Sequence, residues 1–121
     1  YQTHDLLNAM ASDRVASATL RVDGGMVGND WMVQFLADIL AIPIDRPQIM
    51  ETSALGAAYL AGSRVGIYGS PDEFSNLWQR NRRFEPRLEE PERAALLAAW
   101  GDAVARVNLP PLGAGPGAVN E

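Results

Sequence analysis

Apolar side chains recur at helical spacing between residues 27 and 40. Residues three and four positions apart share one face of a helix, so this spacing predicts an amphipathic helix. Asp30, Gln34 and Asp38 recur every four residues on another face, which we expect to meet solvent or a neighbouring domain. The apolar stripe comprises Met32, Phe35, Leu36, Ile39 and Leu40.

Residues that typically begin helices predict four further helices. Ser and Thr are favoured at the N-cap because their hydroxyls accept from free backbone N–H groups, and Pro is favoured in the first turn. Glu73 completes a capping box with Ser70, and Gly66 is placed to end the preceding helix. The predicted helices are residues 3–12 with Thr3 as N-cap and Leu6, Leu7 and Met10 on one face, residues 53–65 with Ser53 as N-cap, a helix from Pro71 capped by Ser70, and a last helix opened by Pro91 with Leu96, Leu97, Trp100, Val104 and Val107 pointing inward.

Two short segments predict strands. Residues 18–22 are rich in β-forming types and predict a buried strand that ends at Asp23. Residues 42–45 contain Pro43 and predict a short edge strand, because proline cannot donate to a sheet. Two strands make a poor sheet, so we expect further strands outside this chain. The pattern therefore predicts an α/β fold, helix-rich, with a short two-strand remnant of a sheet.

Length and composition indicate an ordinary globular domain. The chain has 121 residues, of which 47% are hydrophobic and 21% are charged. No run approaches the roughly 20 apolar residues that span a bilayer. A net charge of -5 without a basic stripe argues against nucleic acid as a partner. Prolines and glycines crowd the end of the chain, so we expect residues 108–121 to form a disordered tail.

Missing residue types exclude several classes of catalytic and metal site. The sequence contains no Cys, no Lys and one His. It therefore lacks the parts for a thiolate nucleophile, a cysteine zinc site, a Walker P-loop, a Ser-His-Asp triad or a multi-histidine metal site. The lack of cysteine is compatible with the cytoplasm, where we expect this protein to act.

A double glycine follows the first predicted strand and opens into a helix. The bare backbone of Gly24 and Gly25, near a helix N-terminus, could lie flat against an adenine ring or a phosphate. Asn29, on the first turn of that helix, can both donate and accept, as the edge of a purine requires. The spacing alone favours a ligand-free turn with Asn29 as an N-cap, and it is not the G-x-G-x-x-G fingerprint.

Two charged groups have a functional and a plain interpretation. Asp23 could hold a metal or order the loop, although a turn-capping aspartate is commoner. Arg80, Arg82 and Arg83 form the densest basic cluster. Such a cluster meets an anionic effector or, more commonly, forms a solvated face paired with nearby acids. The acids nearby in the sequence are Glu85, Glu89, Glu90 and Glu92.

Motifs spread over residues 1–107 carry a specific resemblance. They are Tyr1-Gln2-Thr3 with Asp5, L-R-V-D-G-G at 20–25, Asn29, Q-F-L-A-D-I-L at 34–40, Arg46-Pro47, Glu51-Thr52 and A-L-G-A-A-Y-L-A-G at 54–62. Together they resemble the C-terminal part of the glycerol kinases, in the FGGY carbohydrate kinase family of the actin and hexokinase superfamily. Xylulose and gluconate kinases share the glycine turn and the alanine-rich helix, but the V-D-G-G lead-in and the run from Glu51 look most like glycerol kinase.

The resemblance implies a partial ribonuclease-H-like domain over residues 1–107, on the adenine side of an ATP site. In the family, the second glycine of the turn and the asparagine four residues later line the adenine pocket. Here these are Gly25 and Asn29, with Gly24 beside them. ATP is the co-substrate, and the catalytic aspartate, the glycerol-binding groups and the Mg²⁺ ligands belong to upstream parts of the family's chain.

The resemblance also sets what we expect of this chain as a molecule. No catalytic residue and no metal ligand are expected in it, and ATP or ADP is its expected ligand. Glycerol is expected to bind only the full-length enzyme, which is expected to be a homo-oligomer. The chain alone should have no kinase activity.

Three alternatives remain open at this point. A sister kinase for a pentulose or another sugar would share these motifs, because the substrate pocket lies upstream. A stand-alone nucleotide-binding or interaction module would lack the catalytic half. A structural fragment with an incomplete sheet would bind no ligand, and calorimetry with ADP would separate it from the module.

Overall fold

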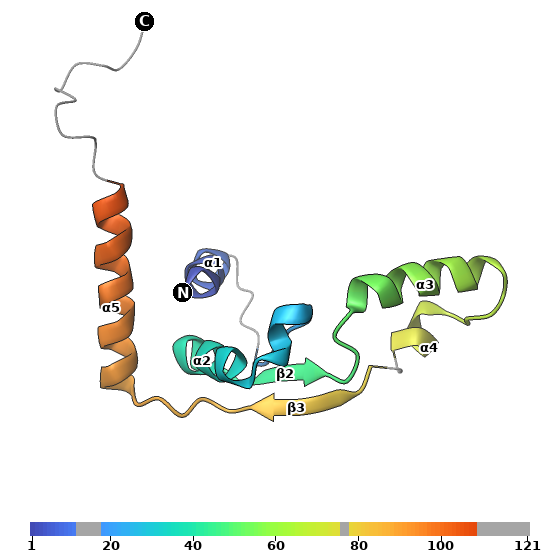
Figure 1. The fold of residues 1–121 in the computed structure, drawn as a ribbon, viewed down its shortest axis with the longest axis horizontal. Coiled ribbons are helices and arrows are strands. Elements are labelled where there is room, and N and C mark those ends of the chain that lie inside the picture. Colours follow the sequence, from blue (N-terminus) through green and yellow to red (C-terminus); the bar gives the residue numbers. More distant parts are fainter. Residues whose placement is uncertain (12–17, 76–77, 109–121) are drawn as a thin grey trace, which may run out of the picture. The chain divides into compact units, whose positions relative to one another are not determined.

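The structure is a computed structural model that describes residues 1–11, 18–75 and 78–108 (Figure 1). The chain divides after Leu88 into two compact units, and each is presented by itself. Of the predicted tail, only Asn108 lies within these ranges, and the last position of the predicted helix 3–12 lies outside them. Within these ranges, no helix is long and apolar enough to cross a membrane.

Helices form in all five regions where the pattern predicts them. The predicted capping box is confirmed: Ser70 Oγ accepts from Glu73 N at 3.3 Å, and Glu73 Oε2 accepts from Ser70 N at 3.0 Å. The first unit contains α1 (Gln2–Ala11), β1 (Leu20–Arg21), the 3₁₀ turn η1 (Gly25–Gly28), α2 (Asp30–Leu40), β2 (Ile44–Pro47), α3 (Thr52–Arg64), α4 (Pro71–Ser75) and β3 (Arg80–Phe84), and the second contains α5 (Glu90–Val107).

Two of the predicted helix starts are wrong. Thr3 lies inside α1, and Ser53 lies inside α3, whose N-cap is Glu51. The hydroxyl of Thr52 donates to a carboxylate in the turn after β1, so a tertiary contact holds the start of α3 instead of a local cap. The predicted end of α3 is confirmed, because Gly66 follows the helix with φ +76°, a conformation that favours glycine.

The sheet has three strands in the order β1-β2-β3. Figure 1 shows β2 and β3 side by side and pointing in opposite directions. β1 is parallel to β2, and β2 is antiparallel to β3. The prediction of an edge strand at residues 42–45 is wrong, because residues 44–47 form the central strand. Sequence pattern missed β3 because only Phe84 of its R-N-R-R-F is buried, which leaves no apolar alternation. The α/β, helix-rich class is confirmed, with three strands instead of two.

A small apolar core joins α2 to the sheet. Val33 and Ala37 of α2 are fully buried, as are Ile44 of β2 and Phe84 of β3. Of the predicted stripe, Ile39 is also buried, whereas its other members are half-buried. The half-buried residues that pack against this core are Leu20, Val22, Met32, Leu36, Leu40 and Met50.

The polar face of α2 binds its own unit. Gln34 Nε2 donates to the Glu85 carbonyl at 2.8 Å, and Asp38 Oδ1 accepts from Arg87 N at 2.7 Å. These bonds attach the segment after β3 to the helix. Gln34 and Asp38 are half-buried, so this face still meets solvent in part while it also holds a segment of its own unit.

The second unit is described by α5 and its C-cap. The helix starts as predicted, with Pro91 in its first turn. The prediction that five apolar residues of this helix point inward is wrong for Val107, which is 84% exposed. Leu96, Leu97, Trp100 and Val104 are half-buried, and no residue of α5 is buried. The described part of this unit holds no second helix or strand on which the helix could bury them.

Candidate functional site

Gly24 makes the turn between β1 and η1. Its backbone has φ +88° and ψ 167°, a region that only glycine occupies readily. Its N–H donates to the Met50 carbonyl at 2.8 Å, which attaches the turn to the segment before α3. Backbone geometry therefore requires the first glycine.

Gly25 opens η1 under different constraints. Its φ is not positive, and a Cβ built on its backbone meets no atom within 4 Å. Neither backbone conformation nor packing among the described residues requires glycine at this position. Its exposed backbone leaves a flat surface that a planar group could approach closely.

Asn29 forms the N-cap of α2. Its Oδ1 accepts from Met32 N at 3.2 Å, which is the plain role that the spacing favoured. The Asn29 Nδ2 has no hydrogen-bond partner among residues 1–11, 18–75 and 78–108. This donor is therefore available while the oxygen is engaged.

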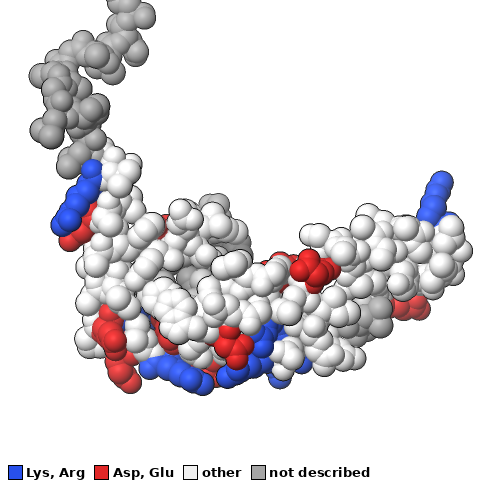
Figure 2. All heavy atoms as spheres, in the orientation of Figure 1, with Lys and Arg blue, Asp and Glu red and all other residues white. Residues whose placement is uncertain are grey.

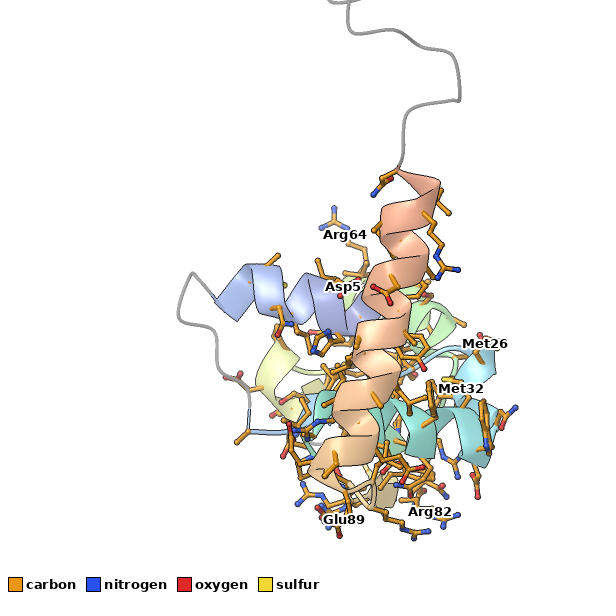
Figure 3. All side chains as sticks on the ribbon, turned by 90° about the vertical axis from the view of Figure 1, so that its left-hand side faces the viewer. Asp5, Met26, Met32, Arg64, Arg82 and Glu89 are labelled. Atoms are coloured by element: carbon orange, nitrogen blue, oxygen red, sulfur yellow. The ribbon has the colours of Figure 1, made fainter. Side chains whose placement is uncertain are left out.

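The short helix η1 holds these residues in a defined arrangement. Val27 N donates to the Gly24 carbonyl at 3.1 Å, and Asn29 N donates to the Met26 carbonyl at 3.2 Å. Val27 is buried in the core, whereas Met26 is 71% exposed and lies on the outer side of the turn in Figure 3. The buried side chain of Val27 thus attaches the turn to the core, while Met26 lies on the opposite, exposed side of the turn.

Asp23 orders the turn. Its carboxylate accepts a hydrogen bond from Thr52 Oγ1, which joins the turn to the first residue of α3. This agrees with the loop-ordering role considered for Asp23. Across the described part of the chain, no three His, Cys, Asp or Glu residues gather as a metal site would need.

Arg46 contacts the turn, and the sequence analysis did not single it out as a site residue. It lies on β2, and its side chain is 11% exposed. Its guanidinium donates to the Val27 carbonyl at 2.9 Å and to Asp30 Oδ1 at 2.7 Å. The Arg46-Pro47 dipeptide belongs to the motifs of the resemblance, which was the one available signal. Its partners lie on other elements, so no local pattern showed them.

The three arginines of β3 pair with aspartates, as the plain interpretation held. Among the described residues no ion pair joins them to the glutamates that follow, although the charge of Glu85 helps to raise the pKa of Arg83. Asp45 accepts from Arg83 at 2.7 and 2.8 Å and lies 3.6 Å from Arg80. Arg82 pairs with Asp30. Figure 2 shows acidic and basic atoms interleaved over β2 and β3. The cluster is therefore only partly neutralised within its own unit, because Asp30 and Asp45 are shared among these three arginines and Arg46.

These pairs shift the pKa values of both aspartates. The hydrogen bond from Arg83 lowers the pKa of Asp45 below its ordinary value, and that from Arg46 lowers the pKa of Asp30. The Asp45 carboxylate in turn raises the pKa of Arg83. Both carboxylates are therefore charged at neutral pH.

A polar hollow of about 260 Å³ adjoins the end of η1. Gly24, Gly25 and Asn29 do not line it. The structure thus places these three residues on one continuous turn but on an open surface. The hollow is lined by Gly28, Arg46, Pro47, Gln48, Met50 and Asn81.

Comparison with known proteins decides the family. Residues 1–64 match the C-terminal domain of the FGGY family of carbohydrate kinases. The chain belongs to this family. Gly24, Gly25 and Asn29 all lie within the matched segment of the FGGY domain, as does Arg46.

Glycerol kinases are among the curated relatives of this FGGY chain. That of Rhodospirillum centenum is 61% identical over 106 residues, and that of Ectopseudomonas mendocina is 54% identical over 108 residues. The alignments cover 88% of this chain but 21% and 22% of those relatives. The chain therefore spans about a fifth of the length of the curated relatives it matches.

Solved structures of FGGY kinases share the fold. Glycerol kinase of Plasmodium falciparum with ADP matches with a TM-score of 0.69 at 31% identity, over 90% of this chain and 22% of that one. Xylulose kinase of Lactobacillus acidophilus matches with a TM-score of 0.54 at 21% identity, over 74% of this chain and 18% of that one. The expected relation to actin and hexokinase-like kinases is thereby confirmed at the level of the fold.

Proposed function

We propose that this chain is the C-terminal part of an ATP-dependent glycerol kinase, which converts glycerol and ATP into glycerol 3-phosphate and ADP. The observation that carries the proposal is 61% identity to a glycerol kinase over 88% of the chain. The likeness to the xylulose kinase, at 21% identity, extends to the fold alone. Glycerol is therefore favoured over a pentulose as the substrate of the complete enzyme.

In this proposal Gly24, Gly25 and Asn29 contribute one wall of the adenine pocket. The open space above Gly25 supports this role, because the chain's own packing does not account for a glycine there. The Nδ2 donor of Asn29, which has no hydrogen-bond partner in the described part of the chain, suits a ring nitrogen of the base. The glycerol kinase of Plasmodium falciparum that this chain resembles was solved with ADP.

The chain positions the nucleotide, and upstream parts of the kinase perform the transfer. Phosphoryl transfer needs Mg²⁺ to neutralise charge on the γ-phosphate and a base to take the hydroxyl proton. No three His, Cys, Asp or Glu residues gather in the described part of the chain, and we assign the Mg²⁺ ligands to upstream parts of the kinase. The turn holds the base end of ATP so that the γ-phosphate meets glycerol in a cleft that closes against water.

Several finer assignments belong to the same proposal. Residues 1–107 form the C-terminal portion of the kinase's C-terminal domain, followed by a tail at 108–121. The complete enzyme works in cytoplasmic glycerol metabolism and is a homo-oligomer. The chain alone has no kinase activity.

Calorimetry with ADP on the 121-residue chain tests the adenine role. Asn29→Ser keeps a side-chain oxygen at the N-cap but removes the Nδ2 donor, so the helix start is retained. We expect ADP binding to weaken in Asn29→Ser while the thermal midpoint stays near that of the wild type. Unchanged ADP affinity in Asn29→Ser would contradict a contact between Nδ2 and the base.

A second experiment uses the complete kinase. Gly25→Leu should raise KM for ATP far more than KM for glycerol, because the leucine occupies the space of the base. Gly101→Leu is the matched control, because a Cβ at this glycine of α5 also meets no atom within 4 Å. Equal changes in both KM values for Gly25→Leu would speak against the adenine role. A kinase that phosphorylates a pentulose but not glycerol would overturn the substrate assignment.

A further inference from the structure

Arg46 joins the two sides of Asn29. One of its nitrogens, Nη1, donates to the Val27 carbonyl at 2.9 Å and to Asp30 Oδ1 at 2.7 Å. Val27 lies two positions before Asn29, and Asp30 follows it as the first residue of α2. A single guanidinium therefore spans the junction between η1 and α2.

The guanidinium of Arg46 is itself held firmly. Its Nε and Nη2 donate to Asn81 Oδ1 of β3 at 3.2 and 3.0 Å. Its Cζ lies 5.3 Å from the centroid of the buried Phe84 ring. Because Asn81 and Phe84 belong to β3, the sheet determines the position of the Arg46 guanidinium beside the turn. Hydrogen bonds from a charged donor are stronger than those between neutral groups, so the bonds of Arg46 limit movement of the turn.

We propose that Arg46 is a positioning residue for the adenine turn, which holds the backbone on both sides of Asn29 and so presents Asn29 Nδ2 to the base. The inference rests on the proposed function. A donor that is already ordered binds a ligand more tightly, because the entropy of ordering is not lost on binding. Arg46 acts through the turn and not through contact with the nucleotide.

Arg83 provides a matched control for a merely structural role. It makes a two-pronged pair with Asp45 at 2.7 and 2.8 Å, on the same small sheet. Within the described ranges it has no hydrogen bond to residues 24–30. Loss of either arginine should lower the thermal midpoint, but only loss of Arg46 should change the turn.

The first measurement is calorimetry with ADP on the 121-residue chain. Arg46→Met should raise the Kd for ADP about tenfold, the change expected from losing one or two hydrogen bonds that order a binding site. Arg46→Lys should raise it at least about threefold, because an ammonium cannot reproduce the planar fork. Arg83→Met should leave the Kd within about twofold of the wild type, because it does not touch the turn.

The second measurement needs no nucleotide. In Arg46→Met, exchange of the Val27 and Asn29 amide hydrogens with solvent should accelerate about tenfold, because these amides report local opening of η1. Arg83→Met should leave both rates unchanged. If Arg46→Met does not fold, Asn81→Ala removes one anchor of the guanidinium and should weaken ADP binding about threefold.

The outcomes separate the two proposals. Equal effects of Arg46→Met and Arg83→Met on ADP affinity, or on amide exchange, would overturn the positioning role. A wild-type chain that binds no ADP would instead contradict the adenine pocket proposed for this chain. The exchange rates of Val27 and Asn29 then decide by themselves whether Arg46 orders the turn.

Discussion

Two of the arginine–aspartate pairs in this chain, Arg46–Asp30 and Arg83–Asp45, differ in which partner is buried. Beside the turn, the Arg46 side chain is 11% exposed and that of Asp30 is 52% exposed. In the sheet, the Arg83 side chain is 38% exposed and that of Asp45 is 7% exposed. A buried guanidinium has five N–H groups and can bind backbone carbonyls as well as an acid. A buried carboxylate only accepts, so it must be surrounded by donors. The first arrangement suits a turn, and the second suits the joining of two strands.

Phe84 lies in the core and against the arginines that pair with Asp30, so removing it should have the largest effect. Its ring is 2% exposed and lies beneath the guanidinium groups of Arg46 and Arg82. Phe84→Ala should cost about 3–5 kcal/mol of unfolding free energy, because it leaves a cavity in a small core. Urea unfolding of the chain measures the loss. Phe74→Ala is the control, since Phe74 is only half-buried in the α3–α4 segment, and an equal cost would contradict the central place of Phe84.

Asp45→Asn sharpens the comparison at the sheet pair. The substitution keeps the shape but removes the charge that Arg83 and Arg80 face. We expect a loss of about 1–3 kcal/mol, because a buried charged hydrogen bond is broken while its arginine partners can still reach water. The same substitution at the exposed aspartate, Asp30→Asn, should cost much less in the same unfolding assay. Equal costs would mean that burial of the acid does not matter.

The pH dependence of stability tests the contribution of the buried Asp45 carboxylate. The folded-state pKa of Asp45 is lowered, so its stabilising effect is complete above the unfolded value of about 3.9 and is lost as pH falls through the lower folded value. The midpoint of thermal unfolding of the wild type should therefore stay nearly constant between about pH 7 and about pH 5, and it should decrease below about pH 4. Asp45→Asn should show a shallower fall, and parallel curves would contradict the assignment.

Asp30→Asn should have the smallest effect on stability. The Asp30 carboxylate is half exposed to water, which screens its attraction to the arginines. Arg46 would keep its bonds to Val27 and Asn81, so the turn should stay folded. ADP affinity should fall only about twofold, in line with loss of the two ion pairs that this half-exposed carboxylate makes with Arg46 and Arg82. A loss as large as that of Arg46→Met would show that the acid, and not the arginine, orders the turn.

Sequence patterns predicted the parts of the fold that depend on neighbours along the chain. The capping box at Ser70 and the stop at Gly66 are correct because each involves residues within one helical turn. The prediction of Ser53 as an N-cap is wrong because α3 starts one residue earlier, at Thr52, whose hydroxyl donates to Asp23 in the turn after β1. The strand at Arg80–Phe84 was missed because a charged strand carries no apolar alternation.

In the candidate site, too, local roles were predicted from the sequence and contacts between distant residues were not. Spacing alone named Asn29 as a helix cap, and its bond to Met32 confirms that local role. Its contact with adenine, and those of Gly24 and Gly25, stay predictions that came from the resemblance. Arg46 was missed because its bonds reach residues far away in the sequence, and nothing beside it on β2 points to them.

The sequence by itself determined the helices, the glycine turn and membership of the FGGY kinases, because local spacing and motif identity carry that information. Only the tertiary structure decided that Gly24 requires its glycine while Gly25 does not, since this depends on a backbone angle and on neighbouring atoms. It also decided which acid each arginine meets. The pairs that converge on Asp30 join residues 16 and 52 positions apart, and folding alone brings such distant residues together.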